Sequence, residues 1–436
     1  MQREFRFDYG LLLSFVVLTV LGILTIFSAG TGGGVGGGDD NEYIKQIYWA
    51  VTGLVVFLLL LFINYQKLGE YAVFIYIACL LLLIFTLIIG KRVRGAKSWI
   101  TLFGGLGFQP SEFVKIGVII VLARYLDRIG EEIKTFRHVC ISLFIVLVPM
   151  GLILLQPDFG TALVYIPIVL TMLFFSGMKY THLIAILIIL GIAIVLPLLV
   201  TYSMLTGSES IAFISTLDDT KTVLLVASVF GALSFVLFIL YKATKKDIFF
   251  KAMSIFLIFF AGLVLATLLG RFLKPYQRKR LIVFLKPAID PYGSGYNIIQ
   301  SKIAVGAGGL FGKGLLGGTQ SQLGFLPERS TDFIFSIFAE EWGFVGSFFI
   351  IVLYGTFVFR GIMIILGAKD RFGSLVASGV LGMFLFHIII NIGMTIGLMP
   401  ITGIPLPFLS YGGSFLITSM VGASLLFNIA SRRYSR

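Results

Sequence analysis

Charged residues are scarce in this chain of 436 residues. Only 13% are Asp, Glu, Lys or Arg, whereas about a quarter of the residues of an average soluble protein are charged. Hydrophobic residues make up 58%. A soluble domain of this length could not bury so much apolar surface, and a disordered chain combines low hydrophobicity with high charge. The composition therefore excludes both classes.

Cysteine and histidine are also rare, with two and three residues. Cys79 and Cys140 both fall in apolar segments, so the sequence predicts neither a disulfide framework nor a metal cluster. The three histidines are scattered along the chain. There is no Walker A phosphate loop and no G-x-S-x-G nucleophile elbow, and no nucleic-acid partner is expected.

Long apolar runs, in contrast, are abundant. A membrane-spanning helix needs ~20 apolar residues, and the alternating ~10-residue segments of an outer-membrane barrel are missing. The sequence predicts an all-α polytopic membrane protein, with residues 1–436 forming one integral membrane domain. About 12 transmembrane helices are expected, at residues 11–29, 46–63, 71–89, 110–127, 138–155, 160–177, 182–201, 222–241, 250–270, 331–358, 373–396 and 408–430.

The distribution of positive charge predicts the topology. An even number of spans puts both termini on one side, and the positive-inside rule favours the cytoplasm. Two outer loops break the rule, because four Lys or Arg residues lie at 91–97 and nine at 271–329. An anionic partner such as a pyrophosphate would explain them. Alternatively, long outer loops are only loosely constrained by the rule.

Several ionisable side chains fall near membrane depth, where a charge costs at least ~2.5 kcal/mol. Glu112 and Lys115 are spaced i, i+3 and can pair on one helix face. The other acids are Asp158, Asp332, Glu340 and Glu341. Each could be structural, and Asp332 could be a helix cap. Together they indicate a polar cavity that opens to the outer face.

Three tracts predict broken helix starts of the kind that line sites in transporters. Gln109-Pro110-Ser111-Glu112 and Gln156-Pro157-Asp158 put a proline where the first turn of a helix tolerates it, with an acid near the positive end of the helix dipole. The third tract, residues 405–414, contains Ser410 and Ser414, which could instead only cap helix ends.

Residues 271–330 form a large extracytoplasmic loop in this prediction. The loop is too apolar to be unstructured, so we expect it to fold back onto the bundle, partly as short or re-entrant helices. It contains Asp290 in an Ile-Asp-Pro-Tyr-Gly sequence. A turn residue before proline is the alternative role for this aspartate.

The chain resembles the SEDS family (shape, elongation, division, sporulation), and within it the RodA branch more than the division paralogues. Six tracts carry the resemblance. They are KSWI with QPSEFVK at 97–115, QPDFGTA at 156–162, DPYGSGYNIIQSKIAVGAGGLFGKG at 290–314, GTQSQLGFLPE at 318–328, TDFIFSIFAEEWGFVG at 331–346 and MPITGIPLPFLSYGGS at 399–414.

The resemblance implies a peptidoglycan glycosyltransferase of the bacterial cytoplasmic (inner) membrane. Such enzymes polymerise lipid II on the outer face during cell elongation and shape maintenance, together with a class B penicillin-binding protein that crosslinks the strands. The essential acid of the family corresponds to Asp290. The family's tryptophan after the third span corresponds to Trp99, and its cavity lysine to Lys115.

The sequence departs from the family pattern in two places. The family has ten spans, with one span where this chain has three, so residues 202–270 are interpreted as an insertion that carries two extra helices. An even insertion keeps the large loop on the outer face. In addition, Ser330 replaces the histidine usually found before TDFIF.

We therefore expect Asp290 to be the catalytic base in an inverting transfer between two lipid II molecules. A divalent cation such as Mg²⁺ is a candidate cofactor, and Asp290 could ligate it instead. The pyrophosphate would be held by Lys115, Arg94, Arg278 and Arg280. The remaining predicted substrate-binding residues are Trp99, Glu112, Asp158, Gln320, Glu328, Asp332, Glu340, Ser410 and Ser414.

Two alternatives belong to other classes. Broken helices and membrane acids also suit a lipid II flippase or another transporter, but a transporter needs polar groups that are accessible from both faces. A scaffold for the crosslinking partner would need neither the acid nor the outer cations. The charge on the outer face favours the enzyme.

Overall fold

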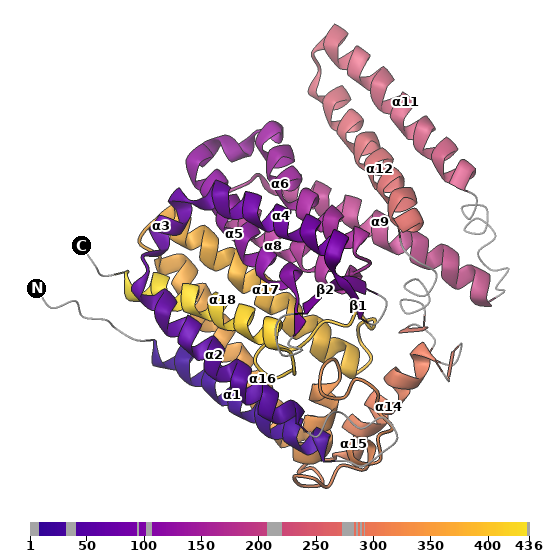
Figure 1. Cartoon of the computed structure of the whole chain (residues 1–436). Helices are drawn as coiled ribbons and strands as arrows, with labels where there is room; N and C mark the ends of the chain where they lie inside the picture. Colours follow the sequence, from indigo (N-terminus) through magenta and orange to yellow (C-terminus); the bar gives the residue numbers. More distant parts are fainter. Residues whose placement is uncertain are drawn as a thin grey trace, which may run out of the picture. The chain divides into compact units, whose positions relative to one another are not determined.

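The computed structural model describes residues 8–31, 41–93, 96–101, 107–206, 220–272, 283–284, 287, 290–291 and 293–433. The chain forms two compact units, which are coloured along the sequence in Figure 1. The first unit comprises Met1–Met178 with Asn297–Arg436, and the second comprises Lys179–Tyr296. The prediction of one domain with an insertion at 202–270 stays a prediction.

Apolar helices make up most of the first unit, as the long hydrophobic runs predicted. The helices are α1 (Tyr9–Gly30), α2 (Glu42–Phe62), α3 (Tyr65–Glu70), α4 (Ala72–Ile89), α5 (Pro110–Ile129), α6 (Phe136–Leu155), α7 (Phe159–Leu163), α8 (Tyr165–Phe175), α15 (Thr319–Gln322), α16 (Ile334–Gly367), α17 (Arg371–Thr395) and α18 (Gly413–Ser431), with the 3₁₀ helix η2 (Gly130–Lys134) after α5. Helices α5, α7 and α18 begin at or just after the three tracts for which broken helix starts were predicted, and α15 is a short helix of the large loop.

The polytopic membrane fold is confirmed. Among the described residues, 10 helices are long and apolar enough to cross a membrane. Two of the twelve predicted spans are helical but fall outside that group. Helix α5 carries five charged residues along its length, and the span expected at 160–177 is divided into α7 and α8, of which the longer has 11 residues.

Helices α17 and α18 are the most buried spans of the first unit, with 72% and 78% of their apolar windows inside the protein. Glycines allow this packing, since a Cβ at Gly382 would clash with Thr171 Oγ1 of α8. Phe408, at the centre of the 405–414 tract, is buried among rings from α1, α16 and α17, namely Phe15, Phe357 and Phe384. The tract is therefore part of the core.

A small antiparallel sheet, which the sequence did not predict, occupies the first of the two basic loops. It consists of β1 (Lys91–Val93), β2 (Ala96–Thr101) and β3 (Gly107–Phe108), in the order β1-β2-β3. Trp99 lies on β2 opposite Lys91. The ring of Trp99 covers Gly107, where a Cβ would lie 2.9 Å from Cε3. The three strands therefore give regular structure to the described part of this loop.

The second unit contains α9 (Tyr180–Thr206), α11 (Thr220–Thr244) and α12 (Asp247–Phe272), which are the three spans expected there. Val223 and Ala227 of α11 and Leu263 of α12 form its core, with Ile192 of α9 packed against them. Helix α14 (Ser294–Ala307) begins at the end of this unit and continues into the first. The large loop is thus partly helical in its described residues, as predicted.

Candidate active site

Two of the predicted broken tracts meet where α5 begins. Pro110 occupies the first turn of α5, as predicted, and Gln109 precedes it in an extended conformation. The backbone N–H of Gln109 donates to Ser414 Oγ at 2.9 Å. Ser414 is buried in the first turn of α18. It therefore satisfies a backbone group of another helix rather than capping its own.

The tract at 156–158 joins the same cluster. Asp158 is the N-cap of α7, where its Oδ1 accepts from the N–H of Thr161 at 3.2 Å. Its other oxygen accepts from Gln109 Nε2 at 2.8 Å. The prediction that Pro157 stands in the first helical turn is wrong, because the helix begins only after Asp158. An aspartate side chain can accept from the first N–H groups of a helix, which explains why it takes the cap position.

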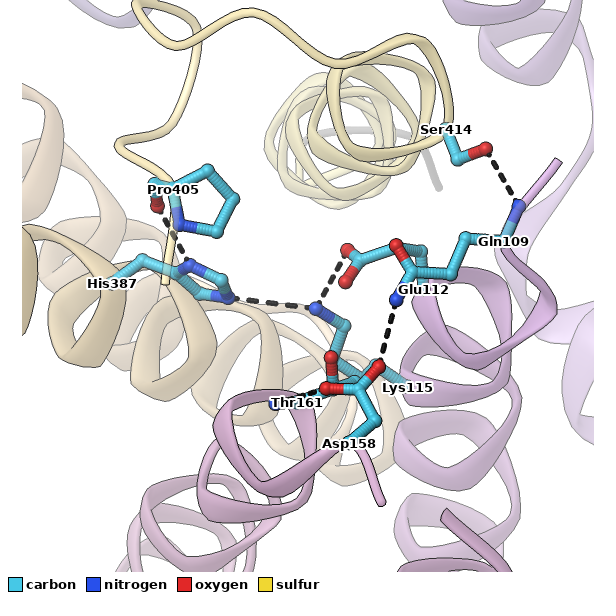
Figure 2. A network of polar contacts seen from close by, with 8 residues as sticks. All are labelled: Gln109, Glu112, Lys115, Asp158, Thr161, His387, Pro405 and Ser414. Carbon is cyan, nitrogen blue, oxygen red and sulfur yellow. Dashed lines mark hydrogen bonds and ion pairs between the residues drawn. The ribbon is translucent and has the colours of Figure 1, made fainter. Parts of the chain in front are cut away.

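Glu112 and Lys115 form the predicted i, i+3 ion pair, with Lys115 Nζ 2.7 Å from Glu112 Oε2. Figure 2 shows the pair at the centre of the network that Gln109 and Asp158 also join. The Lys115 side chain is fully buried and that of Glu112 almost so. Two buried opposite charges remain ionised only if they stay paired, so each holds the other in place.

His387 of α17 completes this network, although the sequence analysis did not select it. Its Nδ1 lies 2.9 Å from the carbonyl oxygen of Pro405, which can only accept. Nδ1 therefore carries the proton, and Nε2 is the acceptor that faces Lys115 Nζ at 3.5 Å. The rings of His387 and Phe415 lie 4.9 Å apart. No local motif marks this histidine, because its partners come from other helices.

Ser410 fixes the 405–414 tract through two hydrogen bonds of its hydroxyl group. It is buried, donates from Oγ to the carbonyl of Thr331 at 2.6 Å, and accepts from the N–H of Leu406 at 2.8 Å. Ser410 thus joins two chain segments and caps no helix. The Ser330 carbonyl accepts from the N–H of Tyr411 at 2.9 Å, so position 330 has a backbone role here.

Asp332 does not cap α16, which begins at Ile334 with Phe333 in the cap position. The carbonyl of Asp332 accepts from Asn391 Nδ2 at 2.9 Å. Glu328 has a left-handed backbone (φ 53°), and its carbonyl accepts from the three N–H groups of residues 331–333. The neighbouring Arg329 is buried, and desolvation lowers the pKa of its guanidinium.

Glu340 organises a second polar cluster in which Gln320 also takes part. Its fully buried carboxylate accepts from Lys313 Nζ at 2.8 Å and from Thr319 Oγ1 at 3.0 Å. The backbone N–H of Gln320 lies 3.1 and 3.2 Å from its two oxygens. The adjacent Glu341 is buried and accepts from Ser28 of α1. These contacts fasten the loop after α14 to α16 and α1.

Helix α16 breaks at this cluster. Gly343 has φ 65° and ψ −161°, and a Cβ there would clash with the backbone nitrogen of Gly312. The loop therefore replaces the helical hydrogen bonds that the break removes. Four backbone bonds of 2.9–3.0 Å do so, from Lys313 to Glu340, from Gly314 to Glu341, from Phe344 to Gly309 and from Val345 to Leu310.

Asp290 belongs to the second unit, in a turn before α14. Its carbonyl accepts from the N–H groups of Gly293 and Gly295 at 3.3 and 3.0 Å. A Cβ at Gly293 would clash with Asp290 Oδ2, so the carboxylate rests directly over this glycine. The other predicted cations, Arg94, Arg278 and Arg280, lie outside the described residues.

Side chains that could ligate a metal are dispersed. Within the described part of the chain, no group of three or more His, Cys, Asp and Glu side chains comes together. These residues do not fit a preformed metal cage. Two polar clusters are present in the first unit instead, one around Lys115 and one around Glu340.

Comparison with known proteins decides the family. The family model described as "Cell cycle protein", which covers FtsW, RodA and SpoVE, matches residues 9–222 and 210–435. The chain belongs to this family. It is 43% identical over 434 residues to the peptidoglycan glycosyltransferase RodA of Treponema pallidum (strain Nichols), and the match covers 98% of each chain.

Solved structures agree with the assignment over the whole length. The crystal structure of the Thermus thermophilus rod shape determining protein RodA is similar with a TM-score of 0.62 and 26% identity, covering 100% of both chains. A chain from a study of polymerization and crosslinking by a peptidoglycan synthase complex gives a TM-score of 0.68 and 29% identity, covering 99% of both. The resemblance stated from the motifs is therefore confirmed.

Proposed function

We propose that the chain is a RodA-type peptidoglycan glycosyltransferase that polymerises lipid II during cell elongation and shape maintenance. The full-length match to a relative that carries this enzyme name supports the proposal most directly. The geometry adds a cation, Lys115, held between Glu112 and His387 within a membrane bundle. A buried, oriented cation can stabilise the negative charge that develops on a leaving pyrophosphate.

Asp290 is the proposed base. It takes the proton from the 4-hydroxyl of the acceptor lipid II as that oxygen forms a bond to the anomeric carbon of the donor. The bond from this carbon to the pyrophosphate oxygen breaks, with inversion, and the lipid pyrophosphate leaves. The proposed pyrophosphate ligands are Lys115, Arg94, Arg278 and Arg280. Asp290 and Lys115 belong to different units, and the role of Asp290 is tested by a variant of its own.

The cellular arrangement follows from the charge distribution. Both termini are proposed to lie in the cytoplasm and the large loop on the outer face of the cytoplasmic membrane. A class B penicillin-binding protein is the proposed partner, supported by the similarity to a chain from a study of the structural coordination of polymerization and crosslinking by a peptidoglycan synthase complex. Mg²⁺ remains a candidate cofactor, and no step above depends on it.

The test uses the purified chain in liposomes with lipid II, alone and with a class B penicillin-binding protein. We expect glycan polymer from the wild type and none from Asp290→Ala, because that variant lacks the base. The thermal stability of the variant in detergent controls for folding. EDTA, followed by Mg²⁺, tests the cofactor. Full polymerisation by well-folded Asp290→Ala would refute the assignment of the base, and lipid II transport without polymer would favour a flippase.

A further inference from the structure

The loop at residues 308–318 carries large apolar side chains that point away from the protein. The exposed fractions are 81% for Phe311 and 65% for Leu310. Leu315 and Leu316 are exposed as well. Several large exposed apolar side chains in one short loop are unfavourable in water and mark a surface that contacts a membrane or a partner.

This loop is held in place rather than loose. Lys313 at its centre pairs with the buried carboxylate of Glu340, and four backbone hydrogen bonds join the loop to both sides of the break in α16. Gly308 and Gly312 allow this approach, since a Cβ on either would clash with a carbonyl oxygen of α16. The apolar side chains therefore project from a fixed backbone.

The apolar surface of the loop continues onto a membrane span. Phe344 and Val345 donate to the carbonyls of Gly309 and Leu310, so these two segments lie side by side. Phe344, Val345 and Phe348 are themselves exposed on α16. Since α16 is one of the candidate spans, its exposed apolar face is the face that lipid covers.

The length of α16 allows the loop to lie at the membrane boundary, with the span at residues 344–367 instead of the 331–358 expected from the sequence. The part of the helix that follows Gly343 is about 36 Å long at 1.5 Å per residue, enough to cross ~30 Å of hydrocarbon without the part that precedes the break. Trp342, which is partly exposed, stands directly before the break. Tryptophan favours the interface between headgroups and acyl chains, so this position independently indicates the same depth.

We propose that residues 308–318 form an interfacial membrane anchor, whose Leu310 and Phe311 side chains insert between the acyl chains of the adjacent leaflet. Lys313 would remain at headgroup level, where its charge is tolerated beside Glu340. Membrane lipid is the partner of these side chains, because they lie beside the lipid-covered face of α16. The proposal depends on the membrane location of the chain and does not depend on its enzymatic activity.

Depth-dependent quenching tests the proposal. The fluorophore NBD is attached to Phe311→Cys in a chain whose two native cysteines, Cys79 and Cys140, are replaced by serine. The protein is reconstituted in vesicles of phosphatidylethanolamine and phosphatidylglycerol. Phe348→Cys on the exposed face of α16 is the lipid-facing control, and Glu131→Cys in the exposed η2 turn is the aqueous control.

We expect doxyl-labelled lipid to quench the probe at position 311 at least half as strongly as the probe at 348. With iodide present on both sides of the vesicle membrane, the probe at 311 should be quenched several-fold less than the probe at 131. Leu310→Cys should behave in the same way, which guards against a local effect of one label. Quenching by iodide equal to that at 131, or protection from both quenchers, would overturn the proposal, since the loop would then face water or protein.

Discussion

Gln109 Nε2 donates to Asp158 Oδ2 at 2.8 Å, so the start of α5 is bonded to the start of α7. Two Gln-Pro tracts that are separate in the sequence thereby become one structural unit. Asp158 uses its second oxygen to cap α7 through Thr161. One carboxylate thus sets the position of both helix starts, next to the buried pair of Glu112 and Lys115 (Figure 2).

Substitution of Asp158 should separate its capping role from its charge. Asp158→Ala removes the cap and should lower the stability of the chain by about 0.5–2 kcal/mol. Asp158→Asn keeps an oxygen that can cap the helix and should cost less. Thermal unfolding of the purified protein in detergent measures both. Equal losses in the two variants would show that the charge, not the cap, matters.

Removal of one member of the Glu112 and Lys115 pair should lower the stability of the chain strongly. Lys115→Met leaves a buried carboxylate without its cation, which costs about 3–5 kcal/mol. The double variant Glu112→Gln/Lys115→Met removes both charges and should be more stable than Lys115→Met alone. Unfolding midpoints of the single and double variants test this. A double variant as unstable as the sum of the two single variants would contradict direct coupling.

His387 should support polymerisation through its unprotonated Nε2, which faces Lys115 Nζ. His387→Phe keeps a ring beside Phe415 but removes the acceptor for Lys115, and should lower polymerisation roughly tenfold, as expected for one lost charged hydrogen bond. His387→Gln, which retains an acceptor, should recover part of the rate. The control is His138→Gln, which changes a histidine paired with Glu132 away from this network. It should retain the wild-type rate of polymerisation from lipid II.

The break in α16 predicts opposite effects for two glycines of one helix. Gly343→Ala forces a left-handed backbone onto alanine and a clash with Gly312, and should destabilise the chain by at least about 1–3 kcal/mol. Gly355→Ala meets open space within regular helix and should stabilise it by about 0.5–1 kcal/mol. Thermal unfolding compares them. A Gly343→Ala variant as stable as wild type would rule out the break.

The turn that holds Asp290 can be disturbed without changing Asp290 itself. A Cβ at Gly293 would clash with the Asp290 carboxylate, so Gly293→Ala should displace this side chain and reduce polymerisation while the chain stays folded. Gly306→Ala, which meets no atom within 4 Å on α14, is the matched control. If both variants polymerise lipid II equally well, the turn does not position the acid.

Much of the fold could be predicted because a bilayer restricts what can span it. Apolar runs of sufficient length must be helical, since their backbone polar groups find no water in hydrocarbon. The Glu112 and Lys115 pair was predictable for a related reason, because helical spacing alone brings i and i+3 together. The motifs around Asp290 and Trp99 indicated the family, which the comparisons confirmed.

The class of protein, its spans and its local pairs could thus be read from the chain, because they depend on residues that are near one another in it. The partners of the buried polar groups could not. His387 faces Lys115 from 272 positions away, and Lys313 of the loop pairs with Glu340 beside the break in α16. Such contacts exist only once remote segments pack together, because no spacing along the chain encodes which helices become neighbours.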